Sequence, residues 1–124
     1  MAKKILVIDD EELIAKSLLK FLKSKGFDVI IAKSGNEAFK KVKEDDFDLI
    51  ISDIKMPKID GIETVKKIRE HLRKSGKQLI PEILITGYAD MEKYEKAMDL
   101  EVADCLYKPF DNTELLRVIQ ENIQ

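Results

Sequence analysis

The sequence predicts an α/β domain in which a doubly wound, parallel sheet of five strands lies between five helices in three layers. Two observations lead to this fold class. Short apolar runs rich in β-branched residues recur without polar alternation, which is typical of strands buried on both faces. Longer segments with helical periodicity separate these runs, and no hairpin signal joins them, which favours parallel pairing through right-handed crossovers. Among the common doubly wound orders, 2-1-3-4-5 suits such a chain.

The predicted strands are short, and the last is weaker than the others. In the expected order, a crevice lies at the carboxyl ends of the first and third strands, where folds of this class bind ligands. Side chains that follow the strands are therefore expected to converge there. In chain order the strands are Ile5–Ile8, Val29–Ile31, Leu49–Ile51, Ile83–Ile85 and a run near Val102–Leu106.

The first two helices are predicted from their apolar faces and their end signals. Gly26 supplies a left-handed cap after the first helix. The residues from Ser34 to Glu37 form a capping box that opens the second helix. The apolar positions are Leu13, Ile14, Leu18, Phe21 and Leu22 in the first helix, and Ala38, Phe39 and Val42 in the second.

The remaining three helices follow the same logic. The third ends near Gly76, Asp90 is expected to cap the fourth, and Asp111 opens the fifth. Their apolar positions are Ile62, Val65, Ile68 and Leu72 in the third helix, Met91, Tyr94, Ala97 and Met98 in the fourth, and Leu115, Leu116, Val118, Ile119 and Ile123 in the fifth.

Length and composition predict one domain spanning residues 1–124. A chain of 124 residues can bury a core unaided, and 44% hydrophobic with 37% charged residues is ordinary for a folded protein. The net charge of −2 offers no basic excess for nucleic acid, and the single Cys105 excludes an internal disulfide. No signal-peptide core or membrane-length apolar run occurs. We therefore expect a cytoplasmic protein that contacts neither membranes nor nucleic acid through this domain.

Charged and hydroxyl side chains follow four of the predicted strands. Asp9 and Asp10 follow the first strand, Asp53 the third, Thr86 the fourth and Lys108 the fifth. Two carboxylates about 4 Å apart repel by roughly 4 kcal/mol at an effective dielectric of about 20, so such a cluster needs a cation or a shifted pKa. Oxygen ligands without nearby histidine or cysteine suit a hard ion, and Mg²⁺ is the expected one.

The same set of residues is suited to phosphoryl transfer onto an aspartate. Asp53 offers a nucleophilic carboxylate, Thr86 a hydroxyl donor and Lys108 a compact positive charge that can hold a phosphoryl oxygen. Catalysis of this reaction consists mostly of positioning and charge neutralisation, which a metal and these side chains would supply.

Four motifs, each at the end of its own predicted strand, together resemble the receiver domains of two-component response regulators, chemotaxis regulators among them. The resemblance runs from Lys4 to the final helix and implies a flavodoxin-like fold. It also implies a signalling domain rather than an enzyme, one that assists its own phosphorylation and dephosphorylation. The motifs are Asp9-Asp10-Glu11, the segment from Asp53 through Pro57 to Gly61, Ile85-Thr86-Gly87 and Lys108-Pro109-Phe110.

The resemblance implies a metal and an acceptor role at the acid cluster. Asp53 would take a phosphoryl group from the phospho-histidine of a sensor histidine kinase or phosphotransfer protein in a Mg²⁺-dependent reaction. Asp10, Asp53 and the backbone carbonyl of Lys55 would bind Mg²⁺ directly, and Asp9 would act through water.

The resemblance also implies how the acyl phosphate is read out. Thr86 and Lys108 would bind the phosphoryl group and report its presence, and the peptide bond before Pro109 would be cis. The expected partners are the kinase and a downstream effector or an output domain outside this chain, since no DNA-binding or enzymatic domain follows the fifth helix. The chain is a stand-alone regulator or part of a longer one, and a monomer or a phosphorylation-dependent dimer.

The sequence departs from the family pattern in three places. Cys105 occupies a position that is commonly aromatic, three residues before the motif lysine, and Tyr107 is the nearby aromatic. Glu101 replaces the glycine expected after the fourth helix. The connection 74–81 is a few residues longer than the family pattern. Our hypothesis is that Thr86 and the loop after it move without an aromatic partner, and that the output surface lies on the fourth helix, fifth strand and fifth helix, with Tyr107 as a modest contributor. Alternatively, Tyr107 itself is the switch.

Simpler interpretations exist for each feature taken alone. Asp9 with Asp10 could form only a loop and a helix cap, Asp53 could be a turn former, and Lys108 could lead into a helix. His71 is expected to be a solvated surface residue. The lysines of the first helix are expected to form a solvated face, with partner docking as the other interpretation.

Three other functions compete with this interpretation. A flavodoxin-like cofactor binder would need a glycine- and hydroxyl-rich loop after the first strand, where this chain has four acids. An aspartyl-nucleophile phosphatase would need a second aspartate two residues after Asp53, where Lys55 stands. A degenerate receiver that only binds partners is disfavoured because the acids, Asp53, Thr86 and Lys108 are all present.

Overall fold

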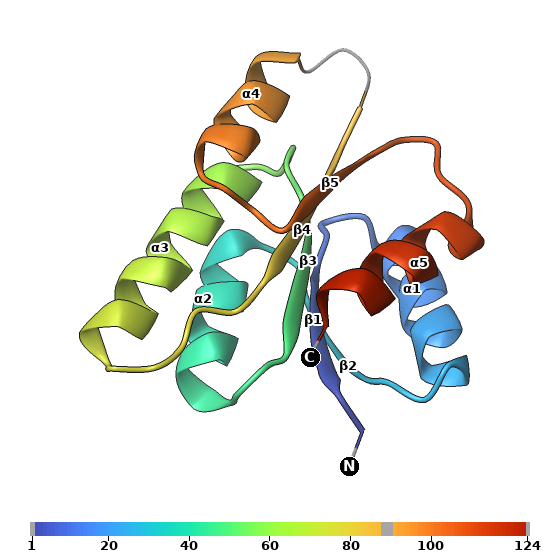
Figure 1. Cartoon of the computed structure of the whole chain (residues 1–124), viewed down its shortest axis with the longest axis horizontal. Helices are drawn as coiled ribbons and strands as arrows, with labels where there is room; N and C mark the ends of the chain where they lie inside the picture. The colour runs from blue at the N-terminus through green and yellow to red at the C-terminus, as the bar shows by residue number, and fades with distance from the viewer. Residues whose placement is uncertain (1, 88–90, 124) are drawn as a thin grey trace.

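The computed structural model describes residues 2–87 and 91–123, within which five strands alternate with five helices (Figure 1). None of these helices is long and apolar enough to cross a membrane. The strands are β1 (Lys4–Ile8), β2 (Asp28–Ala32), β3 (Leu49–Asp53), β4 (Glu82–Thr86) and β5 (Asp104–Tyr107). The helices are α1 (Glu12–Ser24), α2 (Gly35–Glu44), α3 (Gly61–Lys74), α4 (Met91–Asp99) and α5 (Asn112–Asn122).

All neighbouring strands pair in parallel, in the order β2-β1-β3-β4-β5. This arrangement confirms the predicted fold class and strand order. The register places Ile8 of β1 opposite Ser52 of β3, and Asp53 of β3 opposite Ile85 of β4. The residues that follow these pairs therefore lie at one carboxyl edge of the sheet.

Helices cover both faces of the sheet and complete the three layers (Figure 1). α1 and α5 pack on one face, and α2, α3 and α4 pack on the other. Alternate strand residues are buried under opposite layers, because successive side chains of a strand point to opposite faces. The helix residues buried against the sheet are Leu18, Leu22, Leu115, Val118 and Ile119 in the first layer, and Ala38, Val42, Ile68, Leu72 and Ala97 in the other.

Side-chain caps fix where three of the helices begin. In each, the cap accepts a hydrogen bond from the backbone N–H three residues later, which satisfies one of the free donors of the first turn. The predicted starts of α2 and α5 are confirmed, whereas the cap expected at Asp90 lies outside the described residues. The three bonds are Glu37 to Ser34 (3.1 Å), Glu63 to Asp60 (2.9 Å) and Glu114 to Asp111 (2.7 Å).

The apolar face predicted for α1 included one residue that the fold leaves outside. Leu13 is 84% exposed, whereas Leu18 and Leu22 are buried. Nine residues separate Leu13 from Leu22, which is about two and a half turns at 3.6 residues per turn, so the two lie on opposite sides of the helix. The prediction for Leu13 was therefore wrong. Met98, assigned to the apolar face of α4, is also 38% exposed.

The last strand begins two residues later than predicted, because the chain turns between α4 and β5. We predicted a run near Val102–Leu106, but β5 begins at Asp104. Glu101 has a φ of 56°, a left-handed conformation that a glycine adopts without cost. The chain therefore turns at the position where a glycine was expected, and Val102 is buried before the strand begins.

His71 contacts an aromatic ring instead of lying free on the surface as predicted. Its imidazole is half-buried and meets the ring of Phe39 of α2 edge-on, with centroids 5.7 Å apart. Lys43 and Lys67 place their ammonium groups 5.1 and 5.0 Å from the centre of the same phenyl ring. His71 thus contributes to the packing between α2 and α3.

Candidate functional site

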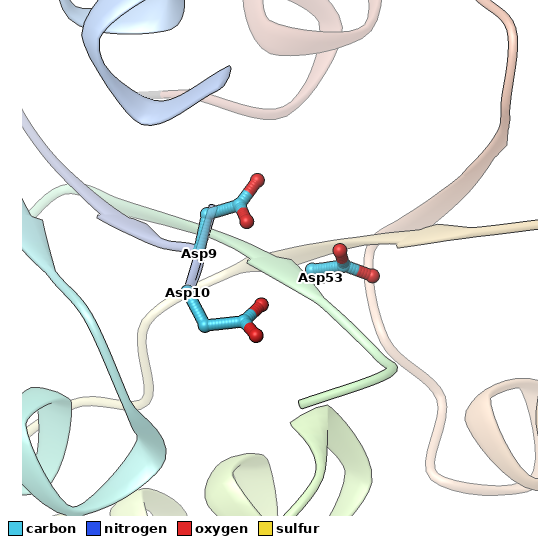
Figure 2. A group of neighbouring side chains, drawn as sticks. All are labelled: Asp9, Asp10 and Asp53. Atoms are coloured by element: carbon cyan, nitrogen blue, oxygen red, sulfur yellow. The ribbon is translucent and has the colours of Figure 1, made fainter. Parts of the chain in front are cut away.

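Three carboxylates converge at the carboxyl edge of the sheet. Asp9 and Asp10 directly follow β1, and Asp53 is the last residue of β3. Because Ile8 and Ser52 are paired, Asp9 lies beside Asp53 in the adjacent strand. One oxygen from each of the three side chains lies within 4.8 Å of the others, and Figure 2 shows Asp9 and Asp10 extending toward Asp53. The predicted acid cluster is therefore present as an arrangement of side chains.

Burial makes it costly in free energy for the carboxylates of this cluster to be charged together. Asp9 and Asp53 are 3% and 5% exposed, whereas Asp10 is exposed. Burial raises the pKa of the Asp9 carboxyl, the N–H of Glu11 opposes this at 2.9 Å, and the charge of Asp53 raises the pKa further. A pair of carboxylates at the 4.8 Å limit repels by roughly 3 kcal/mol at an effective dielectric of about 20. The site is consequently one that a cation would stabilise.

Lys108 provides one positive charge inside this site. Its Nζ lies 3.0 Å from Oδ2 of Asp53. Burial alone would lower the pKa of Lys108, but the bond with Asp53 and the charges of Asp9 and Glu11 outweigh it and raise that pKa. The backbone N–H of Lys55 donates to the other oxygen of Asp53 at 3.2 Å. Both oxygens of the Asp53 carboxylate therefore have a donor.

Thr86 ends β4, between the strands that carry Asp53 and Lys108. Thr86 is 2% exposed, and its hydroxyl donates to the carbonyl of Gly87 over a long distance of 3.4 Å, its one hydrogen bond among the described residues. The backbone N–H of Lys108 donates to the carbonyl of Thr86 at 2.8 Å, which ties the end of β5 to the end of β4. The peptide bond from Lys108 to Pro109 is cis, as the family resemblance implied.

The segment after Asp53, which we call the acceptor loop (residues 54–60), is fastened to the end of β3. Gly61 donates its N–H to the carbonyl of Ile54 at 2.7 Å. A Cβ atom on Gly61 would lie 2.6 Å from the carbonyl oxygen of Asp53, so this close backbone approach requires glycine. The first residue of α3 therefore packs directly on the backbone of Asp53. Lys55 is exposed within the loop, with its N–H directed at Asp53.

An ion pair that the sequence did not predict lies at the end of this loop. Oδ2 of Asp60 lies 2.6 Å from Nζ of Lys93, in the first turn of α4. The spacing between Asp60 and Glu63 is a capping signal and could have identified the start of α3. No local signal links residues 33 positions apart, so the pairing with Lys93 depends on how α4 is placed.

The residues near the expected output surface contact α4. Cys105 is half-buried, and burial raises the pKa of its thiol to about 11. It packs beside the apolar cluster that contains Leu84 and Ala97 and is covered only in part. The ring of Tyr107 lies 5.2 Å from that of Tyr94 at 31°, which connects β5 to α4.

Known proteins resemble the chain along nearly its whole length. The family model described as the response regulator receiver domain matches residues 5–120. The alkaline phosphatase synthesis transcriptional regulatory protein PhoP of Bacillus subtilis is 41% identical over 117 residues, which are 93% of this chain and 46% of that protein. The regulatory protein AtoC of Escherichia coli is 32% identical over 121 residues, 98% of this chain and 25% of that protein. The chain thus spans about half or less of these curated relatives.

Solved structures with the same fold match this chain along nearly their whole length. The chemotaxis protein CheY4 of Vibrio cholerae is 31% identical with a TM-score of 0.88, and the alignment covers 99% of this chain and all of that one. A CheY-like receiver domain protein of Methanospirillum hungatei is 30% identical with a TM-score of 0.87, over 98% of this chain and 93% of that one.

Proposed function

The chain belongs to the family of response regulator receiver domains of two-component systems, and from this premise we propose that Asp53 is its phospho-acceptor. The observation that carries the proposal is the pairing of Asp53 with Lys108 at 3.0 Å beside two further carboxylates. Among these carboxylates, Asp53 is the one bonded to a cation that could hold a transferred phosphoryl group. We propose that the donor is the phospho-histidine of a sensor kinase or phosphotransfer protein.

We propose that Asp9, Asp10 and Asp53, with the backbone carbonyl of Lys55, hold Mg²⁺. The donor set fits, because clustered carboxylate oxygens without histidine or cysteine suit a hard divalent ion. The raised pKa of Asp9 also indicates that a bound cation would relieve electrostatic strain. When bound, the ion would neutralise the carboxylates and the charge on the phosphoryl oxygens.

The side chains of this site support a direct transfer. A carboxylate oxygen of Asp53 attacks the phosphorus, the P–N bond breaks, and its electron pair returns to the imidazole of the donor, which takes up a proton. Lys108 then moves its contact from Asp53 to a phosphoryl oxygen, and the Thr86 hydroxyl, whose contact with the carbonyl of Gly87 is long at 3.4 Å, donates to another.

We propose that residues 1–124 form one receiver domain that acts in the cytoplasm and passes its signal to an effector or to an output domain. Because the curated relatives are about twice as long or longer, the output of the whole protein is part of this proposal. The surface expected to carry the signal is that of α4, β5 and α5.

The acceptor assignment is tested by phosphorylation with acetyl phosphate and Mg²⁺. The parent chain should gain the mass of one phosphoryl group in a form that hydroxylamine removes, because an acyl phosphate is labile to that nucleophile. Asp53→Asn should gain none. Asp46→Asn, an exposed carboxylate before the opposite end of β3, is the matched control and should be labelled like the parent. Equal labelling of Asp53→Asn would reject the assignment.

The metal assignment is tested by titration with Mg²⁺ in the absence of a phosphodonor. Asp10→Ala removes one carboxylate oxygen and one negative charge from the cluster, so Mg²⁺ should bind about tenfold or more weakly. Asp46→Asn should bind Mg²⁺ like the parent. An unchanged affinity in Asp10→Ala would remove this residue from the proposed ligands.

A further inference from the structure

We propose that the ion pair between Lys93 and Asp60 is a latch, formed in the unphosphorylated chain, that holds the first turn of α4 to the acceptor loop and opens when Asp53 is phosphorylated. The inference rests on the proposed function of Asp53 and adds a route from that residue to α4. This route needs no aromatic side chain at position 105, where the chain has cysteine.

Asp60, the loop residue of the latch, is connected to Asp53 through backbone contacts. Asp60 precedes Gly61, whose N–H bonds the carbonyl of Ile54 and whose backbone packs against that of Asp53. Oδ1 of Asp60 accepts the N–H of Glu63 at 2.9 Å, so the same carboxylate also caps α3. A shift of the backbone after Asp53 would therefore displace the Asp60 carboxylate that is paired with Lys93.

The acceptor loop is also strained. Lys58 has a φ of 68°, the left-handed region that costs a residue with a side chain roughly 1–2 kcal/mol. Strain of this kind persists only where the surrounding structure holds it, and it favours a segment with a second arrangement. Asp60 lies two residues after Lys58, so the latch is among the contacts that hold the loop as it is.

The latch itself is a close ion pair between two elements. The two atoms are 2.6 Å apart, and the side chains of Lys93 and Asp60 are 38% and 20% exposed. Burial alone would raise the pKa of Asp60, but the bond from Lys93 and the N–H of Glu63 outweigh it and lower that pKa. The carboxylate is therefore charged at neutral pH and available to hold the lysine.

α4 is attached lightly enough for this ion pair to influence its position. Of residues 92–99, whose side chains the structure describes, Ala97 is the one that is buried. A groove of about 280 Å³ separates α3 from α4, and both Asp60 and Lys93 line it. Opening the latch would thus let the first turn of α4 shift about the ring contact between Tyr94 and Tyr107, which does not involve the ion pair.

The carboxyl end of α4 is held in place by hydrogen bonds, so a movement of the helix would be largest at its amino end. Arg69 of α3 donates from Nη1 to the carbonyl of Leu100 at 2.5 Å, just after α4. The same guanidinium holds Glu82 of β4 with two bonds of 2.8 and 2.7 Å, and both side chains are largely buried. α4 is therefore fixed at its carboxyl end and latched at its amino end.

Linkage gives the direction of the effect. If the latch forms only in the unphosphorylated arrangement, opening it favours the phosphorylated arrangement, and phosphorylation weakens the latch by the same factor. A variant without the latch should therefore bind a phosphoryl mimic more tightly. Simple electrostatics predicts the opposite for loss of a lysine, because removing a cation weakens the binding of an anion.

The experiment measures the affinity for beryllium fluoride at saturating Mg²⁺ by NMR or fluorescence. Lys93→Gln removes the latch, and Asp60→Asn removes its charge while keeping an amide oxygen to cap α3. The double variant closes a mutant cycle. Lys96→Gln, on the same helix and lining the same groove, is the matched control for loss of a cation.

The latch predicts that Lys93→Gln and Asp60→Asn each bind beryllium fluoride about two- to fivefold more tightly, the range expected for a partly exposed ion pair. The double variant should gain no more than either single variant, and Lys96→Gln should gain nothing. An affinity of Lys93→Gln equal to that of Lys96→Gln, or below that of the parent, would overturn the latch. Additive gains would overturn it as well.

Hydrogen exchange of the unliganded variants provides a second readout. Lys93→Gln should speed exchange in the first turn of α4 and in the acceptor loop together, while Lys96→Gln should leave the loop as in the parent. Faster exchange confined to α4 would overturn the link to the loop. A parent that binds no beryllium fluoride would instead reject the proposed function, an outcome that the variants cannot imitate.

Discussion

The ammonium of Lys108 lies 3.0 Å from Oδ2 of Asp53, so a side chain at the end of β5 reaches across the end of β4 to the carboxylate that ends β3. This contact neutralises one of three carboxylates whose oxygens lie within 4.8 Å of each other. A metal ion at the acid cluster would face the same carboxylate. Lys108 and the metal are therefore expected to compete electrostatically for Asp53.

The first prediction follows from this competition. Lys108→Ala should bind Mg²⁺ about two- to tenfold more tightly than the parent, because the site becomes more negative by one charge. The same variant should lose the coupling between phosphorylation and conformational change, since the phosphoryl group loses its cation. Isothermal titration with Mg²⁺ checks the first part, with Lys96→Ala as a control for loss of a distant lysine. Weaker Mg²⁺ binding in Lys108→Ala would show that the lysine supports the metal site instead of competing with it.

The second prediction concerns the phosphodonor. Leu13 is 84% exposed in the first turn of α1, three residues after Asp10, so a large apolar side chain stands in solvent beside the acid cluster. A protein donor would cover this surface, whereas a small phosphodonor would not. Leu13→Ala should slow transfer from a phospho-histidine protein about tenfold and leave labelling by acetyl phosphate unchanged.

Leu79 offers a matched control for this test. It is 45% exposed and precedes the amino end of β4, at the opposite edge of the sheet from the acids. Leu79→Ala should transfer at the rate of the parent with either donor. Equal slowing of the two leucine variants would mean that Leu13 has no specific role in donor binding.

The core was predictable because it depends on local patterns, whereas the strand order was predicted from the common orders of doubly wound folds and not from periodicity. The run Ile5–Ile8 is apolar at successive positions because helices cover both of its faces, and the same reasoning applied to β3 and β4. The convergence of Asp9 and Asp53 then followed from the order of parallel strands.

Contacts that depend on the placement of helices were not predictable from these patterns. Lys93 and Asp60 pair across the space between α3 and α4, and nothing in either segment specifies the partner. Leu13 is a different case, because helical periodicity already places it opposite Leu22, so its exposure could have been predicted from the sequence. The environment of His71 depends on its ring contact with Phe39 in a different helix, so it could not be predicted from the segment around His71.

The third prediction tests the turn after α4. Glu101 has a φ of 56°, which costs a residue with a Cβ atom roughly 1–2 kcal/mol. Glu101→Gly should stabilise the chain by about 0.5–1 kcal/mol, since the relief of this strain exceeds the entropy that glycine adds to the unfolded chain. Urea denaturation measures the change. Glu101→Ala keeps the Cβ atom and should bring no such gain; a gain in both variants would assign the effect to loss of the charge.

The fourth prediction uses the pKa of Cys105. Burial, assisted by the charge of Asp104, raises this pKa to about 11, so the thiol stays protonated at neutral pH. Alkylation by iodoacetamide should therefore be about a hundredfold slower in the folded chain than in the unfolded chain between pH 7 and 8. The rate should rise with pH until about 11. A rate that levels off near pH 9 would mean that the thiol is not shielded.

The last prediction concerns the readout of phosphorylation. Cys105 stands where an aromatic switch was expected, and the ring of Tyr107 packs on Tyr94 of α4 at 5.2 Å. If Tyr107 is a modest contributor, its removal should weaken the response of α4 and β5 without abolishing it. The measurement compares NMR shifts with and without beryllium fluoride in the parent, Tyr107→Ala and Tyr107→Phe.

Tyr107→Phe keeps the ring contact with Tyr94 and loses only the hydroxyl, so it separates packing from hydrogen bonding. We expect shifts across α4, β5 and α5 in the parent and in Tyr107→Phe, and smaller shifts over the same residues in Tyr107→Ala. A parent whose surface does not respond would reject the output surface itself. Complete loss of the response in Tyr107→Ala would make Tyr107 the switch, because neither Thr86 nor the pair of Lys93 with Asp60 would then suffice to move α4.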